Sequence, residues 1–163
     1  MLDGEYIINT DGSCYPNPGG VACWAFLVRS RSGGHVYAKY GCLGSGVDMT
    51  NNVAEYVAML EALRFAAINF RKATIVTDSR LVVDHLNGQA KCSVSGLRPI
   101  YERCQKIIAT ASHLKIGWVP RERNREADHL TRKAQKLFEK SDGKVARLSL
   151  DAWYVEPPPS WER

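Results

Sequence analysis

The sequence predicts an α/β fold, a mixed sheet of five strands with helices on its faces. Three apolar segments near the N-terminus are separated by turn-rich sequence, a pattern typical of antiparallel strands joined by hairpins. Farther along the chain, strands and helices alternate, which favours parallel strands linked by helical crossovers. The 163 residues, with 45% hydrophobic content, suffice for one compact core. We therefore expect one domain over residues 1–140 and a tail at 141–163.

The N-terminal half is expected to form three strands and one long helix. The strands are predicted at residues 6–10, 21–29 and 35–42. A turn-rich stretch that begins at Asp11 follows the first strand, and Gly33-Gly34 marks the hairpin between the other two. A helix is predicted after Asn52, because apolar residues recur there at helical spacing. These residues are Val53, Val57, Leu60, Leu63 and Ala67.

In the second half, strands and helices are expected to alternate. The predicted order is a strand at 73–77, helices at 79–86 and 97–111, a strand at 114–119 and a helix at 125–139. Asn87-Gly88 ends the first of these helices. The tail begins with Ser-Asp-Gly and ends near three consecutive prolines. Its aromatic residues Trp153 and Tyr154 suit either packing against an apolar patch or contact with a partner.

The formal net charge of +5 is unevenly distributed. Residues 98–140 hold 11 Lys or Arg against 5 Asp or Glu, whereas residues 1–97 hold 8 of each. Such an excess suits a polyanionic partner, but a solvated basic helix face explains it equally well. The charge alone does not decide between the two.

The cysteines and the N-terminus favour a cytoplasmic protein. The five cysteines are odd in number and show no Cys-x-x-Cys spacing, so we expect reduced thiols and neither a disulfide framework nor a zinc ribbon. The N-terminal segment Met-Leu-Asp-Gly-Glu carries two acidic residues and no apolar core, and the longest apolar run, residues 21–28, is too short to span a bilayer. We expect no membrane association.

Four acidic residues, Asp11, Glu55, Asp78 and Asp128, stand where a strand or loop meets the next element. Each has a structural explanation: a turn, a capping-box partner of Asn52, a helix N-cap, and a charge in a first helical turn. The four residues taken together favour a shared site, because pairing of the first and fourth strands would bring all four side chains together. Crowded carboxylates need a cation, and Mg²⁺ prefers oxygen ligands. The pattern predicts metal-dependent phosphate chemistry.

Across residues 5–140, the sequence resembles the type 1 ribonuclease H family. The matching segments are Thr10-Asp11-Gly12-Ser13, Thr50-Asn51-Asn52 with Glu55, Thr77-Asp78-Ser79, and Asn124 with Ala127-Asp128. The resemblance implies an RNase H domain with strand order 3-2-1-4-5, the first three strands being antiparallel. It also implies that the partner is an RNA/DNA hybrid, whose RNA strand is hydrolysed with Mg²⁺ or Mn²⁺. No obligate protein partner is expected.

The resemblance implies a role for each carboxylate in a reaction that uses two ions about 3.5–4 Å apart. Asp11 would bridge both ions. Asp78 and Asp128 would complete the shell of one, and Glu55 would hold the other near the scissile phosphate. The expected products have 5′-phosphate and 3′-hydroxyl ends.

Several further residues match substrate-binding positions of the family. Asn17, Asn51 and Asn52 would recognise RNA by its 2′-hydroxyl, which both donates and accepts hydrogen bonds. Thr50 would bind a phosphate of the DNA strand, although Asp48 stands where many relatives carry Arg. These roles compete with ordinary turn and cap chemistry, which Asn also favours.

The sequence departs from much of the family at two places. The loop before the last predicted helix, 118–124, contains no His, and Arg121 or Arg123 would lie near the phosphates instead. No Lys-rich, Trp-rich insertion lies between Gly88 and Leu97, so affinity for hybrid should be modest and strongly salt-dependent.

The remaining His and Trp residues are expected to have structural roles. We assign His35, His85 and His113 to the surface or to packing, and Trp24 and Trp118 to the core. Two other functions remain open: a non-catalytic nucleic-acid or protein-binding module, and a related nuclease acting on double-stranded RNA or on DNA.

Overall fold

The first three strands form an antiparallel meander. In the computed structural model, which describes residues 1–141 and the backbone of 150–153, they are β1 (Tyr6–Tyr15), β2 (Val21–Ser30) and β3 (His35–Ser45). β1 extends five residues beyond the prediction, because the backbone from Asp11 to Tyr15 pairs with residues 21–25 of β2. Strand pairing here overrides the turn propensity of Asp-Gly. The turn begins only at Pro16.

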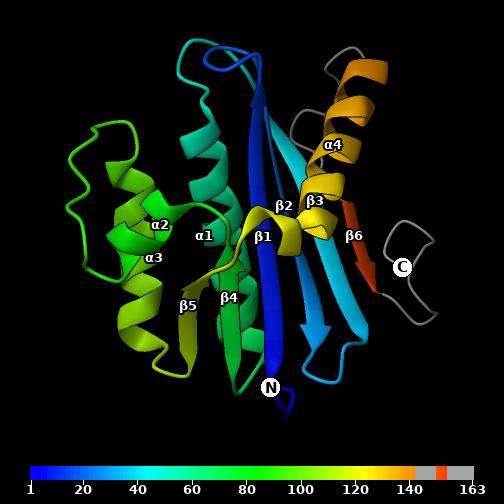
Figure 1. The fold of residues 1–163 in the computed structure, drawn as a ribbon, viewed down its shortest axis with the longest axis vertical. Coiled ribbons are helices and arrows are strands. Elements are labelled where there is room, and N and C mark those ends of the chain that lie inside the picture. Colours follow the sequence, from blue (N-terminus) through cyan, green and yellow to red (C-terminus); the bar gives the residue numbers. More distant parts are fainter. Residues whose placement is uncertain (142–149, 154–163) are drawn as a thin grey trace.

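Two parallel strands complete the predicted sheet. β4 (Ala73–Thr77) pairs with β1, and β5 (Leu114–Trp118) pairs with β4. The order β5-β4-β1-β2-β3 confirms the predicted arrangement 3-2-1-4-5. A sixth strand that the sequence did not predict, β6 (Leu150–Trp153), lies antiparallel on the outer edge of β3. Figure 1 shows it at the edge opposite β5.

Helices cover the two faces unequally (Figure 1). They are α1 (Asn51–Asn69), α2 (Arg80–Leu86), α3 (Arg98–Thr110) and α4 (Arg125–Lys140), with a short 3-10 turn, η1 (Arg121–Arg123), before α4. α1 packs on β1 and β2, and α3 packs on α1. α4 lies on the other face, across β1, β2 and β3.

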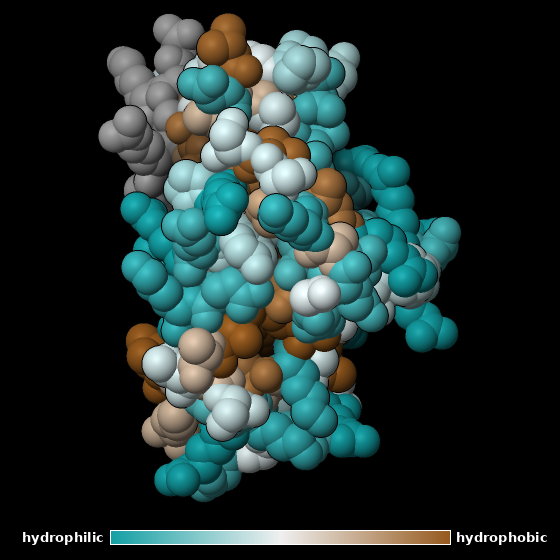
Figure 2. Space-filling model, turned by 90° about the vertical axis from the view of Figure 1, so that its left-hand side faces the viewer, coloured by the Kyte–Doolittle hydropathy of each residue, from teal (hydrophilic) through white to brown (hydrophobic). Residues whose placement is uncertain are grey.

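The core consists of two apolar layers, one on each side of the sheet. The larger lies under α1 and includes Ile8, Phe26, Tyr56, Leu63 and Phe70, all fully buried. The smaller lies under α4 and includes Ala25, Leu27, Ala38, Leu130 and Ala134. The view onto the α2–α3 side shows hydrophilic residues over much of the surface, with apolar residues gathered in the lower half (Figure 2).

Side-chain caps define where α1 and α2 begin. The Thr50 hydroxyl accepts a hydrogen bond from the Val53 N–H at 3.1 Å, so Thr50 is the N-cap of α1. The Ser79 hydroxyl does the same for Val82 in α2. Asn52 therefore lies inside α1, and the capping box that would have given Glu55 a purely structural role does not form.

Two expectations about single residues are wrong. Cys23 and Cys42, which face each other across β2 and β3, form a disulfide, whereas the sequence predicted reduced thiols throughout. Cys14, Cys92 and Cys104 are free and buried.

The second wrong expectation concerns Trp118, which is 38% exposed, although Trp24 lies in the core as expected. Trp118 is the last residue of β5, which is an edge strand of the sheet. No helix in the described part of the chain is long and apolar enough to cross a membrane.

Candidate metal centre

The pairing of β1 with β4 sets the position of the first two carboxylates. Thr10 lies beside Thr77 at the end of the parallel ladder, so Asp11 and Asp78 both follow the last paired residues. Glu55 approaches from α1, because Gly12 has no side chain. A Cβ at Gly12 would lie 2.2 Å from the Glu55 backbone nitrogen, far inside van der Waals contact. The absence of that atom lets the helix backbone touch the strand.

Three of the four predicted carboxylates converge. Each of Asp11, Glu55 and Asp78 offers an oxygen atom, and these atoms lie within 4.8 Å of one another. Asp128, in the first turn of α4, lies outside this group, and its Oδ2 is 3.0 Å from Nη2 of Arg132. It nevertheless lines the same pocket as the other three. The site is thus a cluster of three with a fourth carboxylate at its rim.

Burial and mutual repulsion disfavour the charged form of these groups. Burial, followed by the charges of Asp78 and Asp128, raises the pKa of Asp11 from 3.8 to about 8. Burial and the charges of Asp11 and Asp78 raise the pKa of Glu55 well above its usual range. The pKa of Asp78 is also raised, chiefly by burial. Without a cation, the cluster therefore retains protons at neutral pH.

Hydroxyl groups orient two of the carboxylates. The Thr131 hydroxyl, on α4, lies 3.0 Å from Oδ2 of Asp11 and 2.8 Å from the Asp128 carbonyl, and these two acceptors share its one hydrogen. Thr77, the last residue of β4, donates to Oε2 of Glu55 at 3.4 Å. These contacts hold the acceptor oxygens in place, and Glu55 accepts a further hydrogen bond from the Gly12 backbone.

A buried pair of amides fixes the start of α4 against β1. Asn124 is 1% exposed, and its Nδ2 donates to the Thr10 carbonyl at 2.8 Å. Its Oδ1 accepts from Nδ2 of Asn9 at 3.0 Å. These bonds join residues more than 110 positions apart and so set where Asp128 stands relative to Asp11.

Cationic and aromatic groups form the rim of the pocket. Arg121 lines it, and its charge lowers the pKa of both Asp11 and Asp78, opposing the effect of burial. Trp118 also lines it and donates from Nε1 to the Asp78 carbonyl at 3.1 Å. The Arg80 guanidinium lies 3.8 Å from the centre of the Trp118 ring.

The predicted substrate-binding amides lie together in a neighbouring pocket. Asn17, Thr50, Asn51 and Asn52 all line it. The Asn17 side chain accepts from the Asn51 N–H at 3.0 Å, and the Asn51 side chain accepts from the Cys14 N–H at 2.7 Å. Asn17 and Asn51 thus use their side-chain oxygens on the backbone, and their NH₂ groups have no hydrogen-bond partner among the described residues. Asn51 and Asn52 also line the carboxylate pocket, so the two pockets share a wall.

Arg123 does not line the carboxylate pocket with Arg121. It is exposed and lines a groove on the lower part of the sheet, whereas Arg121 lines the carboxylate pocket. The three-residue turn η1 directs these two side chains into different depressions.

The donor set fits a hard divalent cation. All the converging ligand atoms are carboxylate oxygens, which Mg²⁺ and similar ions prefer over nitrogen or sulfur. Burial first, and then repulsion between neighbouring carboxylates, raises the pKa values of Asp11, Glu55 and Asp78, and a bound cation would favour their charged forms.

Some residues of the site were not found from the sequence. Thr131, Asn9 and Arg80 act through contacts with residues distant in the chain, and none stands in a recognisable local motif. For Thr131 the only available signal was its position three residues after Asp128, one helical turn away.

Comparison with known proteins identifies the family. A family model described as reverse transcriptase-like matches residues 9–134. A ribonuclease H of Campylobacter jejuni is 33% identical over 147 residues, which cover 84% of this chain and 96% of that protein. A bifunctional protein of Mycobacterium tuberculosis is 30% identical over 131 residues, or 80% of this chain. The match spans only 35% of that longer protein.

A solved structure supports the same relationship. The crystal structure of LC11-RNase H1 in complex with an RNA/DNA hybrid matches with a TM-score of 0.73 and 27% identity. The match covers 82% of this chain and 99% of that one.

Proposed function

The chain belongs to the type 1 ribonuclease H family, and we propose on that basis that it is an endoribonuclease that hydrolyses the RNA strand of RNA/DNA hybrids. The observation that supports this most directly is the convergence of Asp11, Glu55 and Asp78 within 4.8 Å, with Asp128 at the rim of the same pocket. A module that had lost catalysis would have no need to keep so many repelling carboxylates together. The bound hybrid of LC11-RNase H1 supports the choice of substrate.

The reaction depends on divalent metal, and we propose Mg²⁺, two ions per site, with Mn²⁺ as a substitute. Asp11, on β1, faces both Glu55 on α1 and Asp78 after β4, and it would contact both ions. Asp78 and Asp128 would hold one, and Glu55 the other. Bound ions supply Lewis-acid stabilisation of the attacking and leaving oxygens.

The protein groups position the substrate and balance the charge. The Thr131 hydroxyl holds Asp11 in one orientation, which removes the need to reorganise that ligand during the reaction. Arg121 would face the scissile phosphate from the pocket rim, where it already offsets the charge of Asp11 and Asp78. The products would carry 5′-phosphate and 3′-hydroxyl ends.

The amide pocket would distinguish RNA from DNA. The NH₂ groups of Asn17, Asn51 and Asn52 are donors to a 2′-hydroxyl, which DNA lacks. The hydroxyl of Thr50 already caps α1, so its proposed contact with a DNA phosphate would use its remaining O–H hydrogen. The catalytic domain would comprise residues 1–140. We also propose a cytoplasmic location; the three free, buried cysteines fit it, whereas the Cys23–Cys42 disulfide does not.

Cleavage of labelled RNA/DNA hybrid, double-stranded RNA and double-stranded DNA tests this function. We expect hybrid cleavage in Mg²⁺ that EDTA abolishes. Asp78→Asn should lower the rate at least about 100-fold, because even residues that only support metal ligands cost 10–100-fold when lost. Asp3→Asn is the matched control, since Asp3 is exposed and remote from the pocket. Equal rates for the two variants, or no hybrid cleavage by the unaltered protein, would refute the proposal.

A further inference from the structure

A groove lies on the part of the sheet that α4 leaves open. α4 packs against β1, β2 and β3, and the same face of β1, β4 and β5 below it is lined by Ile7, Thr74 and Val76. The groove has a volume of about 510 Å³, which is within the range of ligand sites. Its floor is mainly apolar, and its rim is basic.

The rim holds more positive charge than its acidic residue can offset. Glu5 pairs with both Arg31 and Lys72. Three other lining cations, Arg29, Lys115 and Arg123, pair with no carboxylate among the residues that the structure describes. A local excess of cations around a concave surface concentrates the field and favours an anionic ligand.

Two buried nitrogen atoms in the groove also lack a partner within the described residues. Nε of Arg29 and Nε2 of His113 are inaccessible to solvent and make no hydrogen bond. Arg29 is held in place because its Nη2 donates to Oδ1 of Asn9 at 2.8 Å. Both atoms are closed to water, so a phosphate oxygen would not reach them either, and the exposed cations Lys115 and Arg123 are the groups that a phosphate would contact.

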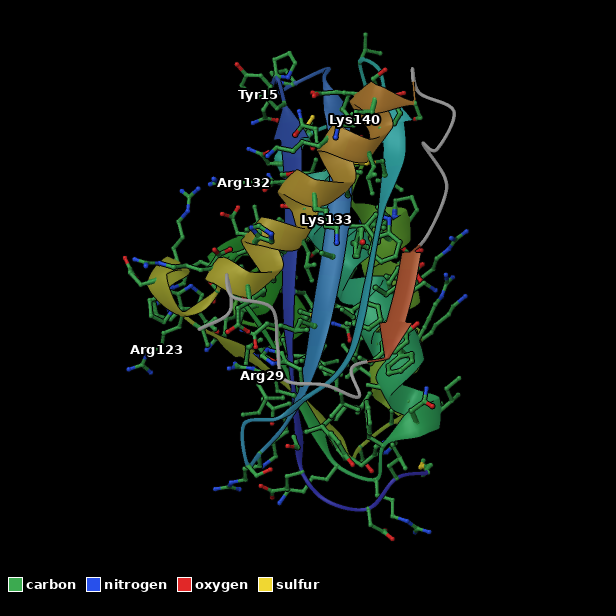
Figure 3. The ribbon with its side chains drawn as sticks, turned by 90° about the vertical axis from the view of Figure 1, so that its right-hand side faces the viewer. Tyr15, Arg29, Arg123, Arg132, Lys133 and Lys140 are labelled. Carbon is green, nitrogen blue, oxygen red and sulfur yellow. A yellow bond between two sulfur atoms is a disulfide. The ribbon has the colours of Figure 1, made fainter. Side chains whose placement is uncertain are left out.

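The groove and the carboxylate pocket share the turn η1 as a wall. Arg121 lines the pocket and Arg123 the groove. A three-residue 3-10 turn is only about 6 Å long, so the two arginines start from backbone positions close to each other. Figure 3 shows Arg29 and Arg123 below α4, apart from Lys133 and Lys140 along that helix.

We propose that this groove binds backbone phosphates of the same hybrid that occupies the catalytic pocket, a few nucleotides from the cleavage site. The proposal rests on the function proposed above, because it takes the hybrid as the source of the phosphates. The groove would be a second binding surface for the substrate, separated by η1 from the carboxylate pocket.

The test measures binding without cleavage. A fluorescent hybrid of about 20 base pairs is titrated in EDTA, over a range of salt concentrations, with Lys115→Gln/Arg123→Gln and with Lys136→Gln/Lys140→Gln. Both pairs remove two exposed cations, but Lys136 and Lys140 lie at the far end of α4, outside the groove. The groove variant should bind about 10-fold more weakly, with a salt slope shallower by about 2, and the control should match the unaltered protein.

A shorter hybrid, about 8 base pairs long, identifies the source of the phosphates. The unaltered protein should bind the long hybrid more tightly than the short one, and the groove variant should lose that advantage. Equal weakening in the two double variants would overturn the proposal. A second result would also overturn it: the groove variant still binds the long hybrid more tightly than the short one but no longer binds single-stranded DNA. The groove would then bind a nucleic acid other than the hybrid in the catalytic pocket. Absence of hybrid cleavage by the unaltered protein would refute the proposed function without altering these binding results.

Discussion

Asp11 is the most deeply buried of the four carboxylates, at 5% exposure, and it faces two others. In the metal-free protein it keeps its proton up to a pH of about 8, whereas an unfolded chain releases it near 3.8. Between these values the folded state holds the extra proton, so the free energy of unfolding falls as the pH rises. The site is therefore a source of instability that grows with pH.

Replacing this carboxylate with an amide should stabilise the metal-free protein. Asp11→Asn keeps an oxygen that accepts from Thr131 but removes the charge. We expect its melting temperature in EDTA to exceed that of the unaltered protein, slightly near pH 5 and by the equivalent of a few kcal/mol near pH 9. Calorimetry across this pH range is the measurement. A variant that melts lower at high pH would show that Asp11 is not repelled by its neighbours.

At the scale of single residues, the sequence predicted the carboxylates but not what orients them. Asp11, Glu55 and Asp78 were found because each stands beside small or polar residues at the end of an element. Thr131 and Asn9 were not, because their bonds depend on which elements become neighbours after folding. Trp118 was wrongly placed in the core because its strand is at the sheet edge, a fact that its own apolar neighbours do not reveal.

Among the elements, the contact between α1 and β1 determines the geometry of the site. The helix backbone reaches the strand at Gly12, and this contact sets the distance from Glu55 to Asp11. The contact involves backbone atoms on both sides, so a rotamer change cannot relieve a clash there.

The substitution Gly12→Ala should push α1 away from β1. We expect a loss of about 3 kcal/mol or more in the free energy of unfolding, together with a large loss of metal-dependent cleavage, because the helix must move away. Gly34→Ala is the matched control, since its Cβ would meet nothing closer than 3.6 Å. Urea denaturation measures both. Similar stabilities for the two variants would contradict the close contact.

The elements themselves were largely predictable. Helical spacing of apolar residues located α1 and α4, and the β-branched run at 73–77 located β4 with its observed bounds. The extension of β1 was missed, because pairing with β2 outweighs the local preference of Asp11-Gly12 for a turn. β6 was missed because a four-residue strand on a sheet edge has too few residues to show a period.

For the molecule as a whole, metal binding should be coupled to stability. The cluster of three carboxylates is assembled by β1, α1 and β4, so an ion binds the folded chain and finds no equivalent site in the unfolded one. The global fold, more than any local sequence, creates the affinity.

Removal of metal should therefore lower the melting temperature. At a Mg²⁺ concentration about 100 times its dissociation constant, we expect the folded state to gain about 2.7 kcal/mol over the same protein in EDTA. Asp78→Asn should show a much smaller gain, and Asp3→Asn should keep the full one. Thermal melts with increasing Mg²⁺ measure this. A melting temperature that does not respond to Mg²⁺ would argue against a metal centre.

The strand at the outer edge of the sheet has a practical consequence for handling the protein. β6 covers the main-chain groups of β3 between Tyr37 and Tyr40, which would otherwise be open to a strand from another molecule. A reporter or affinity tag joined ahead of residue 150 would remove that cover and invite self-association in concentrated samples. Such a tag should be attached after residue 153.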